Sequence, residues 1–155
     1  MKQIKWRPLL TSILAAHLAG QVARLLAGDM AGVYAVMTVP PFSPPGWMFR
    51  PVWLALYTLM GIAAYRVWDA DGAGRRNAIR LYGAQKVLNG LWPMLFFRWG
   101  NGWLAVAAVF ALAGLVFLTM RRFRAIDPAA GRLIVPYLVW VGYMVYLTVG
   151  FLVVG

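Results

Sequence analysis

Residues 40–57 read PPFSPPGWMFRPVWLALY, and they join a proline-rich run to the start of an aromatic segment. The first six residues of this stretch hold four prolines. Because proline fixes φ and lacks a backbone N–H, this run does not form the interior of a helix. Beyond it, Phe49, Trp53 and Tyr57 recur at every fourth position, which places them on one face of a helix. The stretch therefore predicts a stiff connecting segment that leads directly into a helix with an aromatic face.

On both sides of this stretch lie apolar segments that are long enough to cross a membrane. The protein has 155 residues, 63% of them hydrophobic, and its mean hydropathy is +0.71. A membrane-spanning helix takes about 20 apolar residues, and five segments have this length: 8–28, 45–68, 77–99, 102–120 and 129–154. The sequence therefore predicts one domain over residues 1–155, an all-α membrane protein with a bundle of five transmembrane helices. Residues 29–44 form its long first loop.

The net charge of +11 comes from basic residues that cluster at the ends of the apolar segments. In a soluble protein this charge would suggest nucleic-acid binding, but anionic lipid headgroups and the positive-inside rule account for it here. Most basic residues lie on the side that holds the N-terminus and the second and fourth loops: Lys2, Lys5, Arg7, Arg66, Arg75, Arg76, Arg80, Arg121, Arg122, Arg124 and Arg132. We therefore expect an integral protein of a bacterial cell membrane, with a cytoplasmic N-terminus and no nucleic-acid partner.

Side chains that serve conventional catalysis or metal binding are scarce. The chain has no cysteine, four acidic residues that are all aspartates, and one histidine, His17. Disulfides, thiolate chemistry and cysteine-bound metals are excluded, and we expect no metal site and no conventional catalytic constellation. Gln21 and Arg24 follow His17 at four and seven positions, which favours a polar packing seam, with axial haem ligation as the alternative.

Three further helical faces stand out, and they carry amide, aromatic or small side chains. They are Gln85, Asn89, Trp92 and Phe96; Pro136, Trp140, Met144 and Leu147; and the small-residue stripe Ala15, Ala19, Ala23 and Ala27. Because an amide in hydrocarbon needs a hydrogen-bond partner, Gln85 and Asn89 should face the bundle interior. The alanine stripe favours close helix packing, either within the bundle or between subunits.

The tryptophans allow two interpretations that the residues alone leave open. Those at segment ends (Trp6, Trp68, Trp99 and Trp103) fit an interfacial belt. Trp53, Trp92 and Trp140 lie several residues inside their segments. They are either poorly placed belt residues, with the two amides as interhelical contacts, or the lining of a pocket for a flat, mostly apolar ligand.

Three blocks carry a resemblance to a known family: SPPGWMFRPVWLALYTLMGIAAYRVW, GAQKVLNGLWPMLFF and VPYLVWVGYMVYLT, in this order. The chain resembles the translocator protein family, also called tryptophan-rich sensory proteins or peripheral-type benzodiazepine receptors. The resemblance implies a five-helix membrane bundle that forms a homodimer, with the first loop as a lid over a pocket for porphyrins and synthetic ligands.

Together, the helical faces and the family resemblance predict a ligand-binding site. Its residues are Tyr34, Trp47, Phe49, Trp53, Tyr57, Asn89, Trp92, Phe96, Phe97, Trp140, Met144 and Leu147. The lid of this chain departs from the family pattern, since two indoles and a lysine are missing. The C-terminal cholesterol motif is absent too, because no basic residue follows Arg132, so we expect no sterol binding there.

The resemblance implies a tetrapyrrole-binding receptor or sensor, with protoporphyrin IX or haem as ligand and no required cofactor. Indoles can stack on the disc, and Arg24 and Arg50 near the mouth are candidates to reach its propionates. One alternative is a light- and oxygen-dependent porphyrin-degrading enzyme, in which Trp53 and Trp140 are the oxidisable, catalytic pair. Another is a transporter of porphyrins or other apolar solutes. In each case the expected partners are a flat apolar molecule, membrane lipids and a second copy of the chain.

Overall fold

The computed structural model describes residues 3–70 and 72–154, and every regular element within them is helical. The all-α prediction is confirmed. The elements are α1 (Trp6–Ala27), α2 (Met30–Val36), a 3₁₀ turn (Gly46–Met48), α3 (Phe49–Asp69), α4 (Arg75–Pro93), a π-helical turn (Met94–Arg98), α5 (Gly102–Ile126) and α6 (Pro128–Val154).

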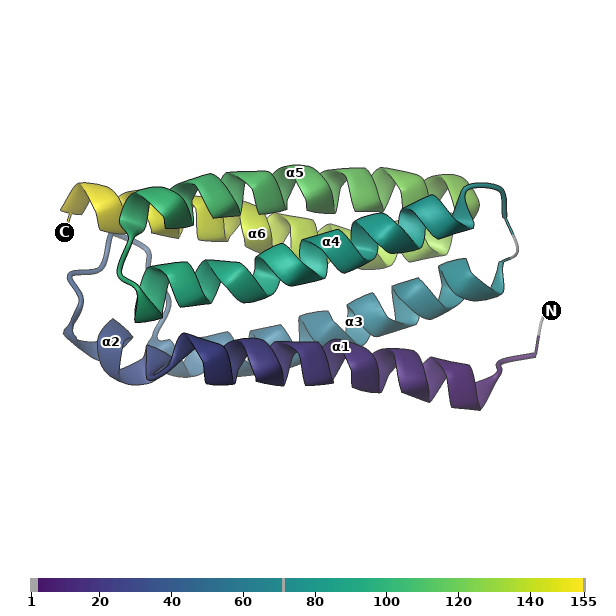
Figure 1. The fold of residues 1–155 in the computed structure, drawn as a ribbon, viewed down its shortest axis with the longest axis horizontal. Coiled ribbons are helices and arrows are strands. Elements are labelled where there is room, and N and C mark those ends of the chain that lie inside the picture. Colours follow the sequence, from purple (N-terminus) through teal and green to yellow (C-terminus); the bar gives the residue numbers. More distant parts are fainter. Residues whose placement is uncertain (1–2, 71, 155) are drawn as a thin grey trace.

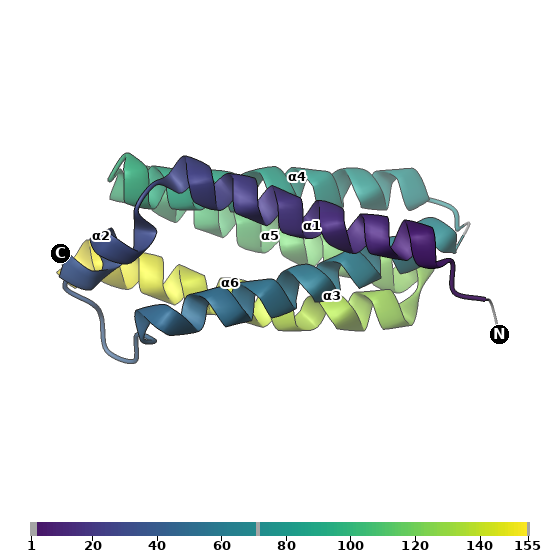
Figure 2. The same cartoon turned by 90° about the horizontal axis from the view of Figure 1, so that it is seen from below.

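The five long helices lie side by side and alternate in direction along the chain (Figures 1 and 2). One end of the bundle holds α2, the proline-rich segment and the C-terminal end of α6. The opposite end holds the start of α1 and the turns that connect α3 to α4 and α5 to α6. We call the first the lid end and the second the turn end.

Four of the long helices, α1, α3, α5 and α6, are long and apolar enough to cross a membrane. The fifth long helix, α4, is not among these four, and it carries Arg75, Arg76, Arg80 and Lys86. The described residues therefore give four candidate spans by length and composition. A membrane crossing by α4 stays a prediction.

Helices α1 and α3 approach each other closely through glycine. A Cβ on Gly61 would lie 2.6 Å from the backbone Cα of Ile13, and one on Gly20 would lie 2.2 Å from the ring of Tyr57. Ser12 donates to the carbonyl oxygen of Gly61 at 2.7 Å, which ties the two helices together. His17 lies 2.8 Å from the Thr58 hydroxyl and so makes a polar contact between α1 and α3, whereas Arg24 donates to Gln21 at an exposed position.

The small-residue stripe of α1 differs from the predicted one. Ala23 and Ala27 are buried as expected, but Ala15 and Ala19 are exposed, and Ala16 and Gly20 are buried in their place. The physical reason is the helical period of 3.6 residues, because a strict four-residue repeat drifts around the helix axis. The buried positions are spaced by four, three and four residues, which keeps them on one face.

The inward face of α6 is also shifted by one position. Pro136 is exposed, whereas Tyr137 next to it is almost completely buried, together with Val141, Met144 and Leu147. The buried positions follow the 3.6-residue period from Tyr137, and a one-residue step turns a side chain by about 100°. Pro136 therefore points away from the interior that it was predicted to line.

Candidate functional site

The predicted aromatic face of α3 meets α6 inside the bundle. Trp53 stacks on Tyr57 with the ring centroids 5.5 Å apart, and its edge meets Trp140 of α6 at 6.2 Å. Phe49 also contacts Trp140, at 6.0 Å between centroids. Offset and edge-to-face pairs at these distances are the favoured aromatic geometries. The helical face that was read from the spacing therefore forms one aromatic cluster with α6.

The predicted face of α4 is buried as well. Gln85, Asn89, Trp92 and Phe96 are all buried, which confirms that the two amides point inward. Asn89 donates through Nδ2 to the Tyr137 hydroxyl at 2.5 Å. Trp92 donates through Nε1 to Thr148 Oγ1 at 3.1 Å. These two hydrogen bonds join α4 to α6, and we call their four residues the bonded set.

Proline shapes the end of α4. Pro93 has no N–H to donate to the preceding turn, and the helix continues as the π-helical turn, closed by the Trp99 N–H on the Met94 carbonyl oxygen at 3.0 Å. Trp92 and Phe96 stack at 5.5 Å, and Phe97 meets Phe96 edge-on at 4.8 Å. The wider turn thus gathers three rings at the lid end of α4, a use of π-turns that recurs at functional sites.

Tyrosine hydroxyls fasten the proline-rich segment to the bundle. Tyr34 of α2 donates to the Pro44 carbonyl oxygen at 2.5 Å, and Tyr146 of α6 donates to that of Pro41 at 2.5 Å. Tyr143 donates to the carbonyl oxygen of Phe42. Burial raises the pKa of Tyr34, so its hydroxyl keeps the proton that it donates. Since prolines have no N–H, their carbonyl oxygens are the groups by which this segment can be held.

The lid end also contacts the aromatic cluster. Tyr34 meets Phe49 at 5.2 Å and Phe151 at 6.0 Å between ring centroids, and Phe151 in turn meets Phe96 at 5.2 Å. Contacts between aromatic rings therefore form an unbroken series, which begins at Trp53, includes Phe49 and Tyr34, and ends at Trp92 and Phe97. Of the predicted residues, Trp47 stands apart, since it is 70% exposed. The remaining eleven lie in or against one continuous interior set.

Several residues of this interior were missed in the sequence. Tyr137, Thr148 and Phe151 are buried and contact predicted residues directly, and Tyr143 meets Trp140 at 5.5 Å. The signal that could have identified them is the helical period. The spacings between Tyr137, Met144, Thr148 and Phe151 are seven, four and three residues, which places all four on one helical face. Starting the face at Pro136 instead of Tyr137 hid it.

Three buried side-chain atoms stand out among the described residues because they have no hydrogen-bond partner. They are the indole Nε1 of Trp140, the ammonium Nζ of Lys86 and the amide Oε1 of Gln85. Buried polar atoms are nearly always paired, and an unpaired one costs about 1–3 kcal/mol. We call Trp140, Lys86 and Gln85 the unpartnered set, and it lies beside the bonded set in the same bundle.

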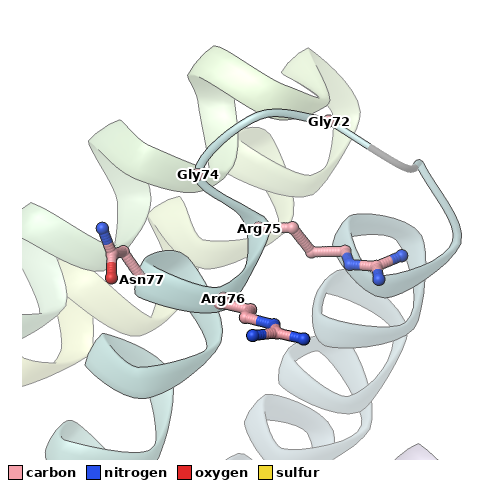
Figure 3. A pocket seen from close by; sticks show the side chains of 5 residues that line it. All are labelled: Gly72, Gly74, Arg75, Arg76 and Asn77. Atoms are coloured by element: carbon pink, nitrogen blue, oxygen red, sulfur yellow. The ribbon is translucent and has the colours of Figure 1, made fainter.

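Two cavities mark the two ends of the bundle. At the lid end, a cavity of about 300 Å³ is lined by Val33, Met37, Phe96, Phe97, Gly100, Gly102, Phe151 and Leu152. At the turn end, a cavity of about 400 Å³ is lined by Gly72, Gly74, Arg75, Arg76 and Asn77 (Figure 3). There Arg75 donates to the Trp68 carbonyl oxygen at 2.8 Å and lies over the Trp68 ring. The apolar cavity is the one that adjoins the aromatic interior.

The tryptophans predicted for an interfacial belt lie on the outside. Trp6, Trp68, Trp99 and Trp103 are all exposed and sit at or near helix ends. Trp92 is buried, and Trp53 and Trp140 are partly buried and pack against the core clusters. The structure thus separates the two groups of indoles in the way that their positions suggested.

Comparisons with known proteins identify the family of the chain. A family profile described as "TspO/MBR family" matches residues 10–154. The chain is 36% identical over 135 residues to the tryptophan-rich sensory protein of Cereibacter sphaeroides, covering 87% of this chain and 83% of that one. It is 34% identical over 143 residues to the translocator protein of Homo sapiens and 32% identical over 143 residues to that of Bos taurus, each match covering 89% of this chain and 84% of the relative. The chain therefore belongs to the TspO/MBR family of membrane proteins.

Proposed function

We propose that this membrane protein is a tetrapyrrole-binding receptor or sensor whose ligand lies against the aromatic cluster beneath the lid. The observation that carries the proposal is Trp140. Its ring meets Phe49 and Trp53, and its buried indole N–H has no acceptor within the described residues. A flat aromatic ligand with polar edges would supply both a stacking surface and an acceptor for this group.

Two further features support this function. The rings that line the interior come from α2, α3, α4 and α6, so a broad disc could contact several helices at once. The relatives are named tryptophan-rich sensory protein and translocator protein, and a sensory role fits a site that is closed by a fastened lid. Ligand entry would require the lid or the rings to move, because the rings contact one another in this structure.

We further propose that α4 crosses the membrane as a fifth span. Helices α3 and α5 run in the same direction (Figures 1 and 2), and α4, which connects them in the chain, runs in the opposite direction and packs along α5. A helix that faces the interior of a bundle can carry more polar residues than one that faces lipid. Basic side chains gather at the turn end, which supports a cytoplasmic placement of that end and of the N-terminus.

A porphyrin titration with matched tryptophan variants tests the proposed site. Purified protein in detergent is titrated with protoporphyrin IX, and tryptophan fluorescence quenching gives the dissociation constant. Trp140→Phe and Trp53→Phe should each weaken binding about tenfold, which corresponds to the loss of roughly 1.4 kcal/mol of stacking and hydrogen bonding. The control is Trp103→Phe, because Trp103 is 76% exposed on the outside of the bundle.

The dissociation constant is the proper readout, since each substitution also removes part of the fluorescence signal. An unchanged constant in both interior variants would reject the site. Absence of saturable quenching in the wild-type protein would reject tetrapyrrole binding altogether.

A further inference from the structure

Lys86 lies near the middle of α4, and its ammonium group is buried. Counted together with the π-helical turn, the helix runs from residue 75 to residue 98, so Lys86 is eleven or twelve residues from either end. At 1.5 Å of rise per residue this is about 16–18 Å, which exceeds the reach of a four-carbon side chain. Lys86 therefore cannot extend its charge to the headgroup region as lysines near helix ends do.

The contacts of the ammonium are aromatic. Nζ lies 4.4 Å from the centroid of the Tyr57 ring and 5.7 Å from that of Tyr82, and it has no hydrogen-bond partner. An ammonium carries three N–H donors and no acceptor. The face of a phenol ring recovers only part of the hydration that such a group loses on burial. The site is therefore electrostatically incomplete as the chain alone builds it.

None of the aspartates among residues 3–70 and 72–154 is placed to complete it. The sequence has four aspartates and no glutamate. Asp29 caps α2, Asp69 pairs with Lys5 at 3.1 Å, and Asp127 pairs with Arg66 at 2.8 Å, all at helix ends. The fourth, Asp71, follows Asp69 in the chain. The described aspartates therefore do not supply an anion for Lys86, and a bound ligand could.

Lys86 adjoins the proposed ligand surface. The Tyr57 ring that contacts the ammonium stacks on Trp53, and Trp53 meets Trp140. Gln85, the neighbour of Lys86, presents a second unpartnered atom and contacts Met60, one turn from Tyr57 on α3. The lysine stem is flexible, so the ammonium can turn from the Tyr57 ring toward a group held beside Trp53.

We propose that Lys86 is the carboxylate anchor of the ligand site, and that it makes the site selective for acidic tetrapyrroles over their neutral esters. This inference rests on the proposed function and adds the chemical class of the preferred ligand. The ammonium would pair with one carboxylate of the ligand while the disc lies against Trp53 and Trp140. Arg24 and Arg50, the two candidates from the sequence, are both exposed, where water would weaken such a pair.

The test compares protoporphyrin IX with its dimethyl ester, in which both carboxylates are masked. Binding of each is measured to the wild type, Lys86→Met, Lys86→Arg and Arg50→Met in the same detergent. We expect the wild type to bind the diacid about tenfold or more tightly than the diester, as for a charge-assisted hydrogen bond. Comparing this ratio among variants cancels any difference in how the two porphyrins partition into the detergent.

Lys86→Met should bring the ratio close to one while leaving diester affinity within about twofold, because methionine keeps the length of the side chain but not its charge. Lys86→Arg should keep a preference for the diacid, and Arg50→Met should keep the wild-type ratio. Should Lys86→Met not fold, Lys86→Gln repeats the test with a neutral polar side chain.

A folded neutral variant that still prefers the diacid would overturn the inference. So would a wild type without preference, or a preference that is lost in Arg50→Met instead; each of these leaves porphyrin binding itself intact. A wild-type protein that binds neither porphyrin saturably would overturn the proposed function and the anchor with it.

Discussion

The bonded set and the unpartnered set both lie in the interior of the bundle, yet they differ in whether their buried polar atoms have hydrogen-bond partners. Asn89 is paired with Tyr137 and Trp92 with Thr148, whereas Trp140, Lys86 and Gln85 each keep a buried polar atom without a partner. A paired group contributes to stability, and an unpaired one costs stability unless something else satisfies it. The difference teaches that hydrogen bonds of the bonded set join α4 to α6, whereas the unpartnered set is where the proposed ligand would supply the missing partners.

The largest expected effect concerns the packing on which the unpartnered set depends. Gly61→Val would place a side chain against the Ile13 backbone, and backbone atoms cannot move aside as a flexible side chain can. We expect a loss of about 3 kcal/mol in stability, together with weaker porphyrin binding because Tyr57 and Trp53 are displaced with α3. Reversible unfolding in mixed micelles measures the first effect, and fluorescence titration the second.

Gly142→Val is the matched control for Gly61→Val. A Cβ at Gly142 meets nothing within 4 Å, and the residue is exposed on α6. Its effect should stay below about 1 kcal/mol. If the two variants lost the same free energy of unfolding, the close contact between α1 and α3 would not be important for stability.

Removing a hydrogen bond of the bonded set should lower the free energy of unfolding. Tyr137→Phe removes the acceptor of Asn89 and leaves a buried amide unpaired, so we expect a loss of about 1 kcal/mol. The double variant Tyr137→Phe/Asn89→Leu should lose less than the sum of the two single variants, since neither partner is then left unsatisfied. Additive losses in this cycle would contradict the pairing.

Two tryptophan variants compare the sets directly. Trp92→Phe removes an indole whose N–H donates to Thr148, so the free energy of unfolding should fall by about 1 kcal/mol. Trp140→Phe removes an unpartnered N–H, which relieves a desolvation cost, but it also loses ring contacts with Phe49 and Trp53. Since these effects oppose each other, stability should change by less than about 0.5 kcal/mol while porphyrin binding weakens. The comparison would fail if Trp140→Phe were the more destabilised protein in the absence of ligand.

The smallest effect is expected at the lid. Tyr146→Phe removes the donor to the Pro41 carbonyl oxygen, but Tyr146 is exposed and water can replace the bond. We expect a cost of about 0.5 kcal/mol, which corresponds to roughly twofold faster porphyrin release in stopped-flow measurements. Tyr65→Phe is the control, because Tyr65 bonds to the Lys5 N–H at the turn end. Similar release rates for both variants would show that Tyr146 does not hold the lid.

Much of this arrangement could be predicted from the residues. Helical class and the inward direction of Gln85 and Asn89 follow from hydropathy and from the cost of an amide in lipid. Proline explains why residues 40–45 lie outside the helices. The tyrosines that hold this segment, Tyr143 and Tyr146, lie about 100 residues away in the chain. Such partners cannot be found by local spacing.

The exact phase of each helix was the main source of error. Choosing Pro136 over Tyr137, and Ala15 over Ala16, moved a face by one position, because several registers fit an apolar helix equally well. Trp47 was carried over with the family pattern, but it is exposed. The sequence also could not distinguish bonded from unpartnered polar groups, since that depends on which residues of other helices lie opposite.

The indole N–H resonances of ¹⁵N-tryptophan-labelled protein test the central claim most directly, because one spectrum reports both sets. Single Trp→Phe variants assign the peaks of Trp140, Trp92 and Trp103. On titration with protoporphyrin IX, we expect the Trp140 peak to move saturably as its N–H finds an acceptor, while the exposed Trp103 keeps its position. A Trp140 peak that stays fixed while bound porphyrin shifts Trp103 would place the ligand on the outer surface and contradict the account.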